Sequence, residues 1–114
     1  MHELGVVFRV IDTVTETAKE NDLSEIHSVT IRLGTVSGVI PEFLTDCWKW
    51  AVNRTELLKG AELIIEPIEA VTYCEDCGGS YDTVAHGRIC PHCGSERTYL
   101  LTGNEFLIEE IAGE

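Results

Sequence analysis

The chain has 114 residues, enough for one domain with a small inserted module. Twenty acidic residues oppose eight basic ones, which gives a formal net charge of −12. A field of that sign repels phosphate backbones and anionic lipids, so nucleic acids and membranes are not expected as partners. A need for solubility alone could explain the excess of acidic residues. The functional alternative is that the negative charge attracts metal cations or a basic protein partner.

The sequence also predicts where the protein works. No apolar run reaches the roughly 18–20 residues that span a bilayer. The opening MHELGVVF lacks the basic region and the small-residue cleavage site of a signal peptide. We therefore expect a cytoplasmic protein. In that reducing compartment the five cysteines are better interpreted as metal ligands or catalytic groups than as disulfides.

The first half of the chain predicts a helix, a strand and a second helix. Apolar residues recur at three- and four-residue spacing from Leu4 to about Asn21, and Phe8 is one of them. Apolar and polar residues alternate over 29–33, which is typical of a half-buried strand. Pro41 is placed to begin the second helix. The apolar stripe of that helix is Leu44, Cys47, Trp48 and Ala51.

Single residues of this half also have predicted places. Cys47 is expected to be buried as a small hydrophobic residue, and Trp48 to lie in the core. Trp50 points elsewhere on the helix, at the surface or at an interface. His27 is expected to be an exposed surface residue.

The second half changes composition at Tyr73. A strand is expected over 63–68, with Pro67 marking an edge or a bulge. Residues 74–97 are rich in Cys, Gly, Ser and Asp and cannot fold through apolar burial alone. Strand character returns from Tyr99 to Ile111, and the Gly103-Asn104 turn predicts a hairpin there.

These elements predict an α+β fold. It consists of a small mixed or antiparallel three-stranded sheet with two helices, plus an inserted module of the zinc-ribbon type with four cysteines. We expect an α/β domain formed by 1–72 with 98–114, and a zinc-binding module at 73–97.

The inserted module carries the strongest chemical signal. Two Cys-x2-Cys knuckles are separated by twelve residues, and four thiolates can converge tetrahedrally on one ion. A glycine follows each knuckle, where a tight turn favours a residue without Cβ. Four ligands leave no open position, so we predict a structural zinc site. Its binding free energy, roughly 10–16 kcal/mol, would fold a module with no core of its own. The ligands are Cys74, Cys77, Cys90 and Cys93.

Two alternatives remain open at this module. Iron competes with zinc, because tetrahedral thiolate sites accept either metal, as in rubredoxin-type sites. His86 and His92 lie in or beside the knuckles. Both are expected to be exposed loop residues, and the alternative is that one of them replaces a protonated thiol at lower pH.

The N-terminus offers a second candidate metal site. The α-amine of Met1 and the amide and imidazole of His2 can close adjacent chelate rings on one metal. Planar nitrogen donors suit nickel(II) or copper(II), and the imidazole must be neutral to bind. The fourth position could be filled by the amide or carboxylate of Glu3, by water or by a partner's side chain.

The order of these features resembles the hydrogenase nickel-incorporation proteins of the HypA/HybF family, over essentially the whole chain. The resemblance rests on the opening Met1-His2-Glu3-Leu4, on the α/β domain, and on the paired knuckles before a final strand. The segment Ile31–Gly34 with Val36 and Ser37 is similar to the family's first strand and turn.

The resemblance implies a nickel metallochaperone. Such proteins act with a partner GTPase to place nickel in the large subunit of NiFe-hydrogenase, and some serve urease. It implies nickel ligands at Met1, His2 and Glu3, and zinc at the four knuckle cysteines. Some members have a histidine directly after each knuckle, where this chain has Gly78 and Gly94. That departure puts in doubt any pH-dependent ligand exchange through those histidines.

The same residues bear on other possible functions. A zinc ribbon that binds nucleic acid would need a basic stripe, which is absent from the sequence. A rubredoxin-like electron carrier and a zinc-ribbon adaptor without nickel delivery remain alternatives. A hydrolytic enzyme would need an open metal position. The sequence shows no nucleophile–base pair, phosphate loop or cofactor fingerprint, so we predict that the protein is not an enzyme.

Overall fold

The computed structural model describes residues 2–114, and of His2 only the backbone. These residues form two compact units. Unit 1 consists of Val39–Glu66 and Leu107–Glu114 together with the chain up to Arg32, and unit 2 consists of Leu33–Gly38 and Pro67–Phe106. The segment 73–97 lies inside unit 2, which extends beyond it on both sides because the strands that flank the cysteines pair with each other.

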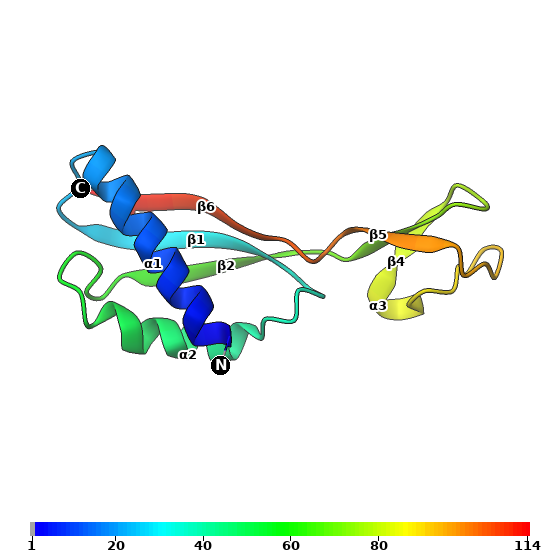
Figure 1. Cartoon of the computed structure of the whole chain (residues 1–114), viewed down its shortest axis with the longest axis horizontal. Helices are drawn as coiled ribbons and strands as arrows, with labels where there is room; N and C mark the ends of the chain where they lie inside the picture. Colours follow the sequence, from blue (N-terminus) through cyan, green and yellow to red (C-terminus); the bar gives the residue numbers. More distant parts are fainter. Residues whose placement is uncertain (1) are drawn as a thin grey trace. The chain divides into compact units, whose positions relative to one another are not determined.

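Unit 1 is built from a three-stranded sheet and two helices (Figure 1). The sheet has the order β2-β1-β6, so β1 is its central strand. The predicted three-stranded sheet with two helices is confirmed, and Pro67 lies in an edge strand as expected. The elements are α1 (His2–Glu20), β1 (Ile26–Gly34), α2 (Pro41–Val52), β2 (Glu62–Ile68) and β6 (Phe106–Gly113).

The helices form because their apolar residues recur with the helical period. Pro41 occupies the first turn of α2, where its missing N–H costs nothing, and Glu42 suits the positive end of the helix. Trp48 is buried at the centre of the unit and its Nε1–H donates to the carbonyl oxygen of Ala61 at 2.9 Å. Other fully buried residues of unit 1 come from α1, β1, α2 and the loop after α2: Val7, Val14, Val29, Ile31, Leu44 and Leu58.

Two helix residues that were predicted to be buried are not fully buried in the structure. Phe8 is 44% exposed and not part of the core. Three- and four-residue spacing covers a wide arc, and the buried arc of α1 is centred on Val7, Val10 and Val14, which leaves Phe8 at its margin. Cys47 is only partly buried. Trp50, predicted at the surface or at an interface, is exposed and meets Phe8 edge to face.

Unit 2 contains a second three-stranded sheet that the sequence did not predict. It has the order β4-β3-β5, and β3 is antiparallel to both neighbours. The hairpin predicted around Gly103-Asn104 is wrong, because β5 pairs with β3 while β6 belongs to the other sheet. The elements are β3 (Val71–Cys74), β4 (Ser80–Asp82), the short α3 (Thr83–His86) and β5 (Thr98–Thr102).

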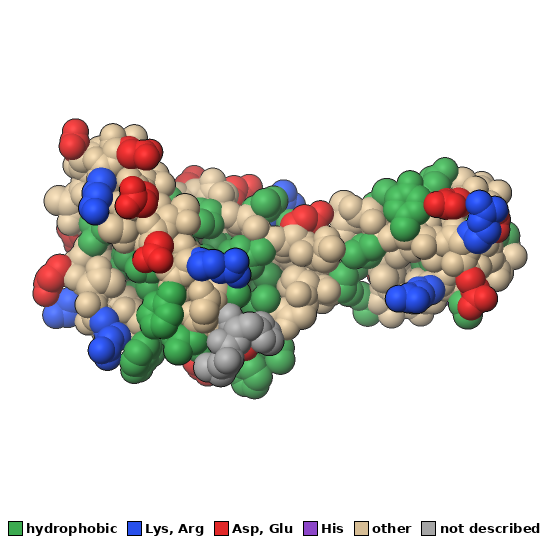
Figure 2. All heavy atoms as spheres, viewed as in Figure 1, with side chains coloured by type: hydrophobic (Ala, Val, Ile, Leu, Met, Phe, Trp, Pro, Cys, Tyr) green, Lys and Arg blue, Asp and Glu red, His purple; other side chains and the backbone are tan. Residues whose placement is uncertain are grey.

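Acidic side chains are spread over the visible face, and hydrophobic side chains are exposed both on unit 2 and at the helices of unit 1 (Figure 2). The exposed hydrophobic residues of these helices include Phe8, Phe43 and Trp50. Among the described residues, no helix has both the length and the apolar character that crossing a membrane requires.

Candidate metal centre

Each cysteine pair lies in a knuckle with the same backbone hydrogen bonds. In the first, the N–H of Gly78 donates to the carbonyl of Cys74 at 2.9 Å, and the N–H of Cys74 donates to Gly79 at 2.8 Å. In the second, Gly94 donates to Cys90 at 2.8 Å, and Cys90 donates to the residue after Gly94 at 3.0 Å.

The glycines after the knuckles are needed for these turns. Gly78 and Gly94 have positive φ of 73° and 75°, a conformation that residues with a Cβ rarely adopt. The same hydrogen-bonded turn occurs in both knuckles, and it directs the two thiols of each pair toward one point. The sequence interpretation of these two glycines is therefore confirmed.

The two knuckles bring four sulfur atoms together. All four Sγ atoms lie within 4.8 Å of one another, and no disulfide joins them. Across the knuckles, Cys74 Sγ lies 3.6 Å from Cys93 Sγ, and Cys77 Sγ lies 3.7 Å from Cys90 Sγ. A tetrahedron with metal–sulfur bonds of about 2.3 Å has edges of about 3.8 Å. The spacing therefore fits one tetrahedral ion.

Burial differs within each pair. Cys74 and Cys90 are buried, while Cys77 and Cys93 are exposed. With Tyr81, the two buried cysteines form a small apolar cluster. Tyr81 Oη donates to the carbonyl oxygen of Gly87 at 2.9 Å, which ties the loop between the knuckles to this cluster. A cluster of this size supplies little burial free energy, so the module depends on another source of stability.

Local hydrogen bonds separate the thiol pKa values. Burial raises the pKa of Cys90, but the backbone N–H groups of His92 and Cys93 and neighbouring thiols lower it to about 6. At Cys93 the backbone N–H of Ser95 lowers the pKa, yet the Cys74 thiol, burial and the other thiols raise it to about 12. Since metal ligands must be thiolates, binding of an ion here releases protons.

The histidines near the knuckles are not brought into the cluster. Among the described residues, the potential ligand group contains the four cysteines alone. His86 and His92 are both exposed, as predicted, and the ring of His86 packs edge to face on Tyr81. Neither imidazole has a nitrogen within the 4.8 Å that joins the four sulfur atoms, and replacement of a thiol by a histidine at lower pH stays a prediction.

A family comparison places these features in context. Residues 1–113 match the family model described as "Hydrogenase/urease nickel incorporation, metallochaperone, hypA". The chain belongs to the HypA family. Curated relatives include a hydrogenase maturation factor HypA of Chlorobaculum parvum, 36% identical over 114 residues that cover both chains completely. A hydrogenase maturation factor HybF of Klebsiella pneumoniae is 30% identical, again over the full length of both chains.

Solved structures of HypA proteins share this fold. The solution structure of the nickel metallochaperone HypA from Helicobacter pylori has a TM-score of 0.71 and 23% identity, covering 97% of this chain and 96% of that one. A second HypA solution structure has a TM-score of 0.75 and 24% identity, and the match covers 100% of this chain and 97% of that one. At these identities the likeness supports the fold alone.

The N-terminal candidate site lies mostly outside the described residues. Met1 and the side chain of His2 belong to the part that the structure does not describe, so their predicted nickel-binding role stays a prediction. Glu3 is described: it lies in the first turn of α1 and is only 4% exposed.

A further group of potential ligands was missed by sequence reasoning. Glu25, His27 and Glu114 lie together on unit 1, all exposed, and His27 Nε2 lies 3.6 Å from a carboxylate oxygen of Glu114. The predicted exposure of His27 is confirmed. No local signal could reveal this group, because Glu25 and Glu114 lie far apart in the sequence and meet only through backbone pairing.

Proposed function

We propose that this chain is a nickel metallochaperone that delivers Ni(II) to the active site of a NiFe-hydrogenase, or of urease, during maturation. The family match over residues 1–113 carries this proposal. Delivery requires a nickel-handling GTPase and the hydrogenase large subunit as partners. The protein acts by binding and transfer, and we assign it no catalytic residue.

In this proposal, nickel binds at the N-terminus through the amine of Met1, the amide and imidazole of His2, and Glu3. Since α1 begins at His2, the backbone N–H groups of its first turn have no carbonyl partner within the helix. In this proposal the metal displaces the amide proton of His2 at the start of this turn. The buried side chain of Glu3 fixes this turn to the unit, which limits the conformational entropy lost on binding.

The second metal in this proposal is a structural zinc ion on Cys74, Cys77, Cys90 and Cys93. The cross-knuckle sulfur separations of 3.6 and 3.7 Å support a tetrahedral thiolate site, which zinc and iron both accept. Bound zinc would cross-link the two knuckles. With four thiolate ligands it would have no open position for a substrate. Metal analysis of the purified protein separates the cases, because iron in such a site is coloured and zinc is not.

Calorimetric titration of nickel(II) into the zinc-loaded, untagged protein tests the N-terminal site. The variants are His2→Ala and a chain with one residue added before Met1, and mass spectrometry first confirms the native N-terminus. We expect one nickel per native chain and loss of that binding in both variants, with zinc retained. Equal nickel binding by all three proteins would instead favour a zinc-ribbon adaptor that delivers no nickel.

Transfer is tested separately from binding. Nickel-loaded protein is mixed with the GTPase and the apo large subunit, and incorporation is measured by hydrogenase activity and bound nickel. We expect native protein to raise incorporation and His2→Ala to leave it at the level without chaperone. Equal incorporation with both proteins would contradict delivery from the N-terminal site.

A further inference from the structure

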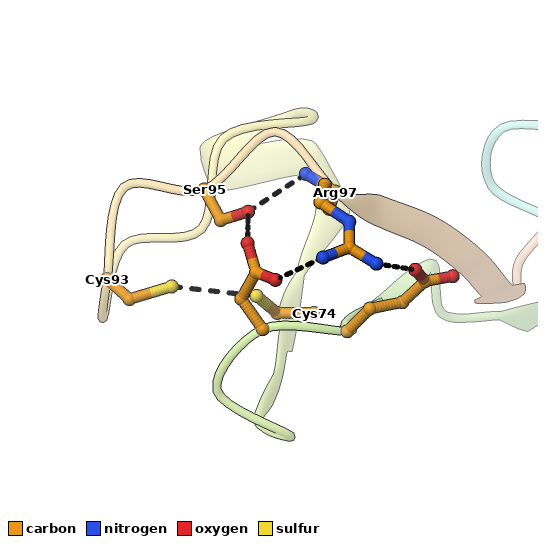
Figure 3. Close-up of polar contacts among 6 residues, drawn as sticks. Cys74, Cys93, Ser95 and Arg97 are labelled. Atoms are coloured by element: carbon orange, nitrogen blue, oxygen red, sulfur yellow. Dashed lines mark hydrogen bonds and ion pairs between the residues drawn. The ribbon is translucent and has the colours of Figure 1, made fainter.

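A set of polar contacts joins the two knuckles independently of the sulfur atoms (Figure 3). The guanidinium of Arg97 donates through Nη1 to Asp76 Oδ1 at 2.9 Å and through Nη2 to Glu75 Oε2 at 3.4 Å. The hydroxyl of Ser95 donates to the other oxygen of Asp76, and Ser95 Oγ accepts the backbone N–H of Arg97 at 3.0 Å. We call these four residues the clasp.

The clasp connects the two loops that carry the ligands. Glu75 and Asp76 are the two residues between the cysteines of the first knuckle, and Ser95 and Arg97 follow the second knuckle. The backbone N–H of Glu75 also donates to the carbonyl of Arg97 at 2.9 Å. The contacts therefore hold the same two loops that a bound metal would hold.

We propose that the clasp is a positioning device for the zinc centre, which keeps the two knuckles in ligand geometry and slows the loss of zinc. This inference rests on the proposed zinc site at the four cysteines. When one metal–sulfur bond breaks, a clasped knuckle stays beside the ion and the bond re-forms. Without the clasp the loops separate, and the remaining bonds break sooner.

Charge adds a second reason for the role of Arg97. A divalent ion held by four thiolates leaves the centre negative, and Glu75 and Asp76 add two more carboxylates beside it. Arg97 forms ion pairs with both carboxylates. Its loss would leave the acidic groups to repel the thiolate centre, so zinc retention depends on its charge as well as on its hydrogen bonds.

The clasp lies at the surface, which limits its strength. The side chain of Arg97 is 71% exposed and that of Asp76 is 40% exposed. Single exposed ion pairs contribute little, but here one guanidinium bridges two carboxylates within a network. We expect a change of about three- to tenfold in zinc release rate, and we expect salt to screen part of it.

Zinc release from the zinc-loaded full chain to a chromogenic chelator tests the proposal, at low and at high ionic strength. The variants are Arg97→Gln, Asp76→Asn, Ser95→Ala and the double Arg97→Gln/Asp76→Asn. Arg88→Gln is the matched control, because it removes the same charge from the same unit outside the clasp. Circular dichroism of each zinc-loaded variant verifies that it is folded before release begins.

The clasp predicts faster release in all three single variants at low salt and an unchanged rate in Arg88→Gln. The combined effect of the double variant should be smaller than the product of the two single effects, since both single variants remove the contact between Arg97 and Asp76. High salt should bring the native rate toward that of Arg97→Gln. Equal rates of zinc release from zinc-loaded native protein and from zinc-loaded Arg97→Gln would overturn the clasp proposal but not the proposed zinc centre. Native protein that holds no metal would overturn the proposed zinc centre as well.

Discussion

Gly34 lies against Gly103 so closely that no side chain fits between them. A Cβ on Gly34 would lie 2.0 Å from the carbonyl oxygen of Gly103. The N–H of Gly34 donates to Glu105 and that of Val36 donates to Gly103, both at 2.8 Å. This backbone contact joins the segment Leu33–Gly38 to the rest of unit 2, although the two are far apart in the sequence.

We expect Gly34→Ala to destabilise the protein by about 1–3 kcal/mol, because the new methyl group meets backbone that cannot move aside. Urea unfolding measures the loss. Gly5→Ala is the control: a Cβ at Gly5 has nothing within 4 Å, and Gly5 lies inside α1. That change should be stabilising by about 0.5–1 kcal/mol, since alanine is the better helix former. Similar effects of both substitutions would contradict the close backbone contact.

The two tryptophans allow a matched test of the unit 1 core. Trp48→Phe removes the buried Nε1–H donor to Ala61 and leaves a small cavity. We expect a loss of roughly 2–4 kcal/mol in the free energy of unfolding. Urea denaturation followed by emission of the remaining Trp50 gives the value.

Trp50→Phe is the control for that measurement. Trp50 is 51% exposed and contacts Phe8 and the guanidinium of Arg54 at the surface. We expect a change within about 0.5 kcal/mol, as for most surface substitutions. A loss as large as that of Trp48→Phe would mean that this surface contact contributes as much stability as the buried hydrogen bond.

Local patterns predicted the two long helices and the two cysteine knuckles. A Cys-x2-Cys pair followed by glycine specifies its own turn, so Gly78 and Gly94 indicated both knuckles from the sequence alone. Helical spacing likewise predicted α1 and α2. It could not exclude Phe8 from the core, because the width of the buried arc depends on what packs against the helix.

Pairing between distant segments could not be predicted. The Gly103-Asn104 turn signal indicates that the chain bends there, but not which strand lies beside it, and β5 pairs with β3 instead of β6. The strand β3 was missed since it is short and ends at Cys74, a ligand position. The contact of Asp76 with Arg97 was missed for a similar reason: nothing in either residue's neighbourhood specifies the other.

Two carboxylates of the unit 1 sheet give a pH dependence of stability. A hydrogen bond that protonated Glu66 donates to Glu109, together with the negative charge of Glu109, raises the pKa of Glu66 above 4.5, and Arg32 opposes this. An acid whose folded pKa is raised adds stability below its unfolded pKa, and this stability is lost as pH rises through the folded pKa.

We therefore expect Glu109→Gln to raise the unfolding midpoint at neutral pH and to have less effect near pH 3, well below the ordinary pKa of a glutamate, where Glu66 is protonated in both proteins. Thermal unfolding at both pH values measures this. Glu56→Gln makes the same change of charge at another exposed site of unit 1. If it raised the neutral midpoint equally, relief of overall negative charge, and not the Glu66 pair, would be the cause.

Metal removal should affect the two units unequally. All three tyrosines, Tyr73, Tyr81 and Tyr99, lie in unit 2, and both tryptophans lie in unit 1. The buried cluster around the cysteines contains one aromatic residue, so we expect unit 2 to depend on the proposed metal, whereas unit 1 has a core of its own. A zinc chelator at neutral pH should abolish the tyrosine near-ultraviolet circular dichroism and leave the tryptophan emission maximum unchanged.

Mild acid should act in the same way as the chelator, because protonated thiols release the ion. Cys90→Ser should resemble the chelated native protein without any chelator, and Cys47→Ala, on α2, should keep its zinc and its tyrosine signal. Parallel loss of the tyrosine and tryptophan signals on chelation would show that the metal supports both units. In that case the apolar core around Trp48 would not be sufficient to hold unit 1 folded.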